Sequence, residues 1–83
     1  MFIVMKTTWQ KNPESFKQAA LGAFCKPRHA EATAEREFDR EIEKMEASGT
    51  RPFEIVDDNS YEICSEDENT QIHIEVLEVE ELD

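Results

Sequence analysis

The sequence predicts an α+β domain in the order β-α-α-β-β-β, with two helices packed on one face of a mainly antiparallel sheet. Three observations predict this fold class. The chain opens with an apolar, β-branched segment, two stretches between Asn12 and Gly49 have helical spacing, and apolar and polar residues alternate after Arg51. With 83 residues, the chain is expected to form a single domain, residues 1–83, around one modest core.

The first two predicted elements are a strand and a helix. Residues 2–8 are apolar on both faces at the start, as in a covered strand. The run Asn12-Pro13-Glu14 is typical of a helix start, since Asn caps, Pro fits the first turn and Glu complements the dipole. The apolar residues that follow have the spacing of one helical face: Phe16, Ala19, Ala20, Ala23 and Phe24. Pro27 is expected to end this helix near Cys25.

A second helix is predicted from about His29 to Ser48, with Gly49 as its C-terminal stop. At 100° per residue its narrow apolar stripe consists of Ala34, Phe38, Ile42 and Met45. Acidic residues flank this stripe on both sides. We expect Phe16, Phe24 and Phe38 to cover one face of the sheet.

The remaining segment predicts a three-stranded antiparallel meander. Apolar residues alternate with polar ones in three runs, which contain Phe53 and Ile55, then Tyr61 and Ile63, then Ile72, Ile74 and Val76. Residues 57–60 and 66–69 are rich in Asp, Asn and Ser and supply the turns. After Val76 the apolar positions change parity, which predicts a bulge or a strand end.

Charge is distributed very unevenly along the chain. The net charge is −11; residues 1–30 carry five Lys or Arg and one acid, whereas residues 31–83 carry four Lys or Arg and nineteen acids. No Lys or Arg follows Arg51. Because nucleic-acid binding needs cationic contacts to phosphates, the acidic part predicts no direct binding to nucleic acid.

The acids of the last third are expected to form one surface. If helices cover one sheet face, the other presents Glu54, Glu62 and Glu75 in a band. Alternate residues on a strand are about 6.8 Å apart, which is about two phosphate steps along one DNA strand. The predicted partner-binding residues are these three, five acids of the turns and two aromatic anchors: Asp57, Asp58, Glu66, Asp67, Glu68, Tyr61 and Trp9.

The sequence predicts no enzyme, metal site or cofactor. Cys25 and His29 have a C-x₃-H spacing, but Cys64-x₈-His73 is not a usual spacing for zinc ligands. The acidic turns lack the calcium-loop pattern. No Ser-His-Asp, Cys-His or Gly-rich phosphate-binding motif is present.

A soluble cytoplasmic protein is expected from three absences. No apolar run approaches a membrane span, and the opening MFIVM is too short and too uncharged for a secretory signal. The two cysteines do not suggest a disulfide framework. Met5 is an alternative start to Met1.

The segment EIVDDNSYEICSEDENTQIHIEVLEVEELD, residues 54–83, gives the chain a resemblance to a class of proteins. In charge, size and mixed α/β pattern the chain resembles phage-encoded DNA-mimic inhibitors, including anti-restriction and anti-CRISPR proteins. This resemblance implies an inhibitor that occupies the basic, nucleic-acid-binding surface of a partner protein. These inhibitors share no common motif, so the resemblance assigns no individual residue. The basic N-terminal third suggests a contact on one side only.

Two alternatives remain open from the sequence. The chain could be a structural or regulatory subunit that binds through helix 29–48 or through a strand edge, including a homodimer paired through residues 2–8. It could also be an antitoxin-like partner of a basic toxin. Charge reversal at Glu62 and Glu75 separates an acidic inhibitor from a subunit that assembles through apolar area.

Overall fold

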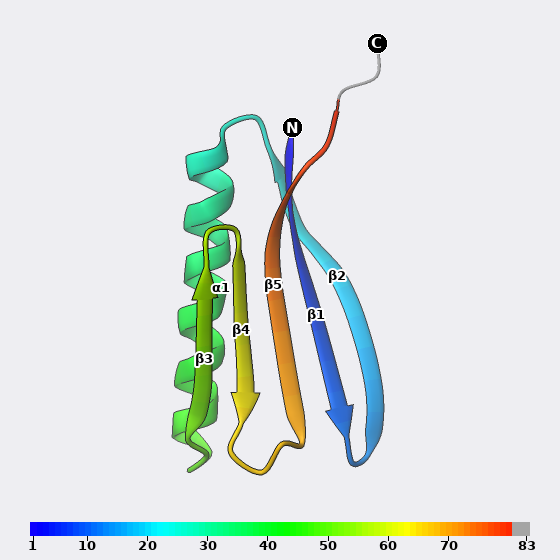
Figure 1. The fold of residues 1–83 in the computed structure, drawn as a ribbon, viewed down its shortest axis with the longest axis vertical. Coiled ribbons are helices and arrows are strands. Elements are labelled where there is room, and N and C mark those ends of the chain that lie inside the picture. Colours follow the sequence, from blue (N-terminus) through cyan, green and yellow to red (C-terminus); the bar gives the residue numbers. More distant parts are fainter. Residues whose placement is uncertain (81–83) are drawn as a thin grey trace.

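The computed structural model describes residues 1–80, which form one five-stranded sheet with a single helix on one face (Figure 1). The elements are β1 (Phe2–Lys11), β2 (Glu14–Phe24), α1 (Pro27–Ala47), β3 (Pro52–Asp57), β4 (Ser60–Ser65) and β5 (Thr70–Glu78). The strand order is β2-β1-β5-β4-β3, and all neighbouring strands are antiparallel. The expected α+β sheet is present, but its order is β-β-α-β-β-β.

The helix predicted after Asn12 is wrong, because this segment is strand β2. Asn12 and Pro13 form a tight turn, and β2 pairs with β1 from Lys11↔Glu14 to Phe2↔Phe24. Asn and Pro are turn residues as well as helix-start residues. Pairing along β1 gives the backbone groups of β2 their hydrogen bonds, which outweighs the helix preference of its alanines.

A bulge in β2 determines which of its apolar residues reach the core. Val4 pairs with Gly22 and Met5 with Ala20, so Leu21 is the extra residue of β2. Leu21 packs against the core together with Phe24. Phe16 lies on the other face and is 66% exposed. The expectation that Phe16 covers the helix side of the sheet is therefore wrong.

The second predicted helix is present as α1, although Pro27 begins it instead of ending an earlier helix. Proline suits the first helical turn because its missing N–H needs no partner there. At the other end, Gly49 has φ +83° and the N–H of Thr50 donates to the carbonyl oxygen of Met45 at 3.0 Å. Gly49 thus ends α1 as predicted.

The predicted meander is also present, but the parity of β3 is reversed. The two-residue turn Asp58-Asn59 pairs Asp57 with Ser60 and therefore Glu54 with Ile63. Because turn length determines register, Glu54 lies on the helix side of the sheet. The prediction that Glu54 shares a band with Glu62 and Glu75 is wrong.

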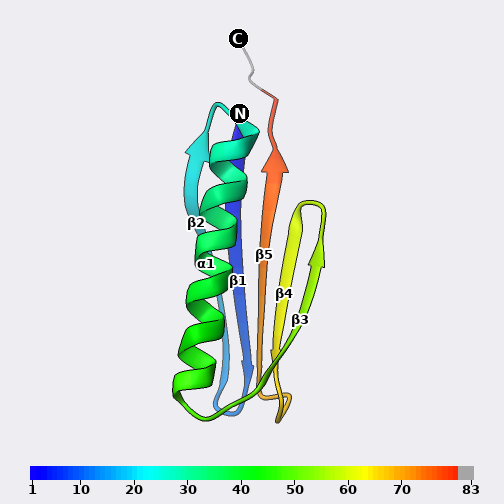
Figure 2. The same cartoon turned by 90° about the vertical axis from the view of Figure 1, so that its left-hand side faces the viewer.

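The core lies between α1 and the middle of the sheet. In Figure 2, α1 lies in front of β1, and the β3–β4 hairpin lies beyond β5, on the side away from the helix. The buried apolar residues are Val4, Ala30, Ala34, Phe38, Met45, Ile63, Ile72 and Ile74. Among residues 1–80, α1 is too polar to be a membrane-spanning helix.

A partly buried ion cluster joins α1 to the sheet. The Nζ of Lys6 on β1 lies 2.7 Å from Oε1 of Glu41 and 2.9 Å from Oε1 of Glu37. Burial alone would lower the pKa of Lys6, but the hydrogen bonds and charges of both glutamates raise it above 10.5. Burial alone would raise the pKa of Glu41, but Lys6 and Lys44 lower it below 4.5.

Replacing Lys6 with Met should lower the free energy of unfolding by about 1–3 kcal/mol, because Glu41 then keeps only its longer contact with the exposed Lys44. Lys17→Met on exposed β2 is the matched control and should change it by less than about 0.5 kcal/mol. Replacing Lys6 and Glu41 together with Met should recover most of the loss. Chemical denaturation of the three variants measures these differences, and equal effects of Lys6→Met and Lys17→Met contradict the structural role of the cluster.

The same cluster predicts how stability depends on pH. Since the pKa of Glu41 is lower in the folded state, its contribution is present above pH 4.5 and is lost as the pH falls through the lowered pKa. Since the pKa of Lys6 is raised, its contribution is present below pH 10.5 and is lost as the pH rises through the raised pKa. Unfolding followed from neutral into acidic pH should show a shallower dependence for Glu41→Gln than for wild type. Identical slopes contradict the assignment.

Candidate functional site

The sheet face opposite α1 is the candidate binding surface, and we call it the open face. The pairing registers place its side chains in rows across the strands. One row contains Phe16, Trp9, Gln71, Cys64 and Phe53. The next contains Gln18, Thr7, His73, Glu62 and Ile55, and the third contains Ala20, Met5, Glu75, Ser60 and Asp57.

The two lateral margins of the open face are apolar. At the β2 margin, Phe16 and Trp9 are paired residues that are 66% and 40% exposed. At the β3 margin, Phe53 and Ile55 are 61% and 63% exposed. Large exposed side chains gathered on one face are typical of an interaction surface.

The centre of the open face is polar and acidic. Gln71 donates from Nε2 to Oε1 of Glu62 at 2.6 Å, which orients this carboxylate. Oγ of Ser60 and Nε2 of His73 are hydrogen-bonded at 2.8 Å. Glu75 lies directly across from Ser60 on the neighbouring strand. The result is a central acidic strip, with Glu62 and Glu75, between two apolar margins.

None of the acids from Glu54 to Glu80 forms an ion pair within residues 1–80. Every ion pair in this part of the chain has Glu37 or Glu41 of α1 as its carboxylate. Lys6 is thereby engaged on the helix side and does not neutralise the open face. The acids of β3 to β5 thus have no ion-pair partner within residues 1–80, and this half of the molecule attracts cations.

The predicted partner-binding residues occupy three places. Trp9, Glu62 and Glu75 share the open face, whereas Glu54 and Tyr61 lie on the helix side, where the Tyr61 ring packs 5.1 Å from that of Phe38. The β3–β4 end carries Asp57 and Asp58, and the β4–β5 turn carries Glu66, Asp67 and Glu68. These two groups lie at opposite ends of β4. Because β4 has six residues, its ends are about 20 Å apart.

The acidic turn between β4 and β5 is ordered by its own hydrogen bonds. Oδ1 of Asp67 accepts from the Ser65 hydroxyl at 2.6 Å and from the Asn69 N–H at 3.0 Å. These bonds lower the pKa of Asp67 below 3.8, so the carboxylate remains charged at neutral pH. Glu81 and Asp83 of the acidic segment lie outside the described residues.

A second acidic row lies on α1 and was not among the predicted site residues. Glu31, Glu35 and Asp39 lie on the side of α1 that faces Tyr61. Burial, followed by the negative charges of Glu35, Glu31 and Asp39, raises the pKa of Tyr61 above 10.0. The helical spacing of these three acids is visible in the sequence. Their position beside the meander depends on how α1 packs.

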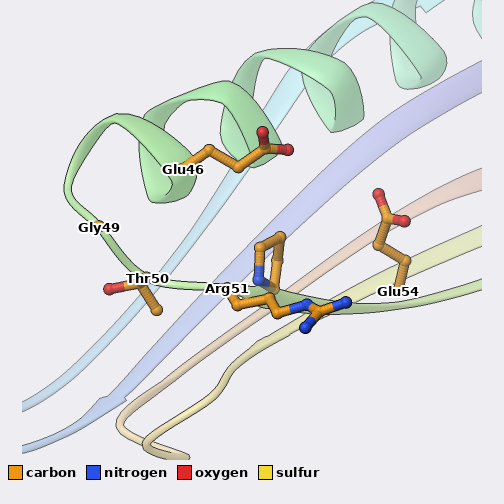
Figure 3. A pocket seen from close by; sticks show the side chains of 6 residues that line it. Glu46, Gly49, Thr50, Arg51 and Glu54 are labelled. Carbon is orange, nitrogen blue, oxygen red and sulfur yellow. The ribbon is translucent and has the colours of Figure 1, made fainter.

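A hollow at the C-terminal end of α1 has mixed charge (Figure 3). Glu46 of α1 and Glu54 of β3 contribute carboxylates, and the linker residue Arg51 extends along the hollow toward Glu54. Because Arg51 places a cation here, this hollow attracts cations less than the open face does. The open face is the better candidate site.

The cysteines and histidines lie in two separate places in the fold. Cys25 precedes α1, His29 is in its first turn, and Cys64 and His73 lie on the sheet. Within residues 1–80, no group of three or more Cys, His, Asp or Glu side chains has the arrangement of a metal site.

Comparisons with known proteins add no relative. No protein-family model matches the chain, and no match is found among curated proteins or solved structures.

Removing charge from the central strip should stabilise the isolated protein. Replacing Glu62 and Glu75 together with Gln should raise the free energy of unfolding by about 0.2–1 kcal/mol at low ionic strength, because neighbouring like charges repel. The gain should shrink in high salt, which screens the repulsion. Denaturation at two salt concentrations measures it, with Glu41→Gln, which should destabilise, as the contrast. A loss of stability in the double variant contradicts uncompensated repulsion.

Proposed function

We propose that this protein is a small binding protein whose open face engages a basic, nucleic-acid-binding surface of a partner protein. The observation that carries the proposal is that the acids from Glu54 to Glu80 have no ion-pair partner within residues 1–80. A partner that supplies Lys or Arg relieves the resulting repulsion. Such a contact stabilises the complex relative to the free protein.

The proposed contact combines charge with apolar anchors. Complementary charge accelerates encounter and selects the partner, but buried aromatic side chains supply most of the affinity in protein interfaces. Trp9 and Phe16 are exposed at one margin of the acidic strip, and Phe53 is exposed at the other. The open face thus offers both components on one surface.

The spacing of the central carboxylates supports competition with nucleic acid. Glu62 pairs with His73, and Glu75 is two residues farther along β5, so the two glutamates are diagonal neighbours. Diagonal neighbours lie about 7–8 Å apart, close to two phosphate steps of about 6.8 Å along one DNA strand. We infer an inhibitor of the DNA-mimic type, anti-restriction or anti-CRISPR in class. It acts in the cytoplasm, in keeping with the free thiols of Cys25 and Cys64.

One observation favours a second candidate function, a structural or regulatory subunit. Strand β3 is a sheet edge, and three of its six residues, Phe53, Ile55 and Val56, are exposed apolar side chains. An unpaired edge with such side chains suits the addition of a strand from another chain. Assembly of this kind depends on apolar area and tolerates charge reversal on the acidic strip.

The proposal is tested with a partner captured from a host lysate on the immobilised protein. Binding should weaken by about tenfold or more between 50 and 200 mM NaCl, because several exposed charge pairs are screened. A DNA or RNA duplex that binds the partner should displace it from the column. An affinity that does not change with salt, or a partner that nucleic acid fails to displace, overturns the proposed competition.

Charge reversal separates the two candidate functions. Glu62→Lys with Glu75→Lys should abolish binding of a basic partner but leave a β3-mediated assembly intact. Glu54→Lys is a matched control, since Glu54 is an exposed strand residue on the opposite face. If Ile55→Asp abolishes binding while the double reversal does not, the subunit function is favoured. Circular dichroism of each variant verifies that the fold is retained.

A further inference from the structure

A depression on the open face is lined by groups of complementary chemistry. It is formed by Thr7 and Trp9 of β1, Glu62 of β4, and Gln71 and His73 of β5. Strand β5 lies between the other two, so Gln71 and His73 form its floor, and Trp9 and Glu62 lie on opposite sides. The depression therefore has an aromatic wall facing a carboxylate wall.

The carboxylate of Glu62 is held in place by one hydrogen bond, and it can accept more. Oε1 of Glu62 accepts the short hydrogen bond from Gln71. Within residues 1–80, no hydrogen bond or ion pair involves Oε2 of Glu62. A carboxylate oxygen accepts more than one hydrogen bond, and a charged donor makes the strongest. Glu62 is thus prepared to accept a cationic donor from outside the chain.

The aromatic wall is equally available. The side chain of Trp9, the one tryptophan of the chain, is 40% exposed although its strand is paired on both sides. Tryptophan is the aromatic side chain that attracts cations most strongly over its ring face. A cation in the depression interacts with this ring and with Glu62 together.

We propose that this depression binds an arginine side chain of the partner protein. A planar guanidinium stacks on an aromatic ring and presents several N–H donors at its edge, whereas the compact lysine ammonium does not stack. The side-chain amide oxygen of Gln71 on the floor and the hydroxyl of Thr7 on β1 offer further acceptors. Phosphate-bearing ligands are disfavoured because no Lys or Arg lines the depression.

The inference rests on the proposed function for the presence of a basic partner, but the site can be tested without that partner. The probe is N-acetyl-arginine amide, added to ¹⁵N-labelled full-length protein and followed by NMR. The Trp9 indole and the Gln71 side-chain amide should shift in a saturable manner. N-acetyl-citrulline amide has nearly the same shape without the charge and should produce no saturable shift. N-acetyl-lysine amide should bind more weakly than the arginine derivative.

Variants then assign the binding to this depression. Glu62→Gln should weaken the arginine probe about two- to fivefold, the ratio for one exposed charge pair. Trp9→Leu should remove the saturable shift at Gln71. Glu54→Gln lowers the net charge equally on the other face and should change nothing. If citrulline and arginine derivatives act alike, or if Glu54→Gln weakens binding as much as Glu62→Gln, the site is overturned.

The two proposals fail separately. A captured partner that binds wild type, Glu62→Gln and Trp9→Leu equally, yet is displaced by nucleic acid, overturns the arginine site and leaves the proposed function standing. A saturable arginine site in a protein whose partner resists displacement overturns the proposed function and leaves this depression standing.

Discussion

The pairing of β1 on both sides is the constraint from which the rest of the structure follows. Strand β1 binds β2 along one edge and β5 along the other, so it connects the N-terminal hairpin to the C-terminal meander. With both edges occupied, residues 2–8 offer no edge for pairing to a second chain. The edges of the sheet are instead β2 and β3, at opposite margins of the open face.

β1 also determines which acidic residues pair with Lys6. Its register directs Lys6 to the helix side, where the ammonium binds Glu37 and Glu41. A partly buried pair of glutamates on α1 is acceptable because this lysine lies between the helix and the sheet. The acids of the meander from Glu54 to Glu80 form no ion pair with a lysine within residues 1–80. One ion cluster thus stabilises the fold and leaves the other half of the molecule negatively charged.

The open face is unusual because its apolar margins and acidic centre belong to one uncovered surface. A charged face without anchors would serve only solubility, and an apolar face without charge would favour self-association. A net charge of −11 opposes contact between two copies of this chain. The combination of Trp9, Phe16 and Glu62 is therefore better suited to a basic partner than to a second copy.

The sequence by itself determined the meander, the extent of α1 and its end at Gly49, because alternation, helical spacing and a glycine stop are local signals. It also determined that no Lys or Arg follows Arg51, whereas the fold decided that Lys6 pairs with α1 and not with these acids. Tertiary structure alone decided that residues 14–24 form a strand, because the preference of their alanines was outweighed by hydrogen bonding along β1. It likewise decided the faces of Glu54, Phe16 and Phe53. These faces depend on the exact length of the turn at Asp58-Asn59 and on pairing with distant strands. The alternation of apolar and polar residues specifies neither of them.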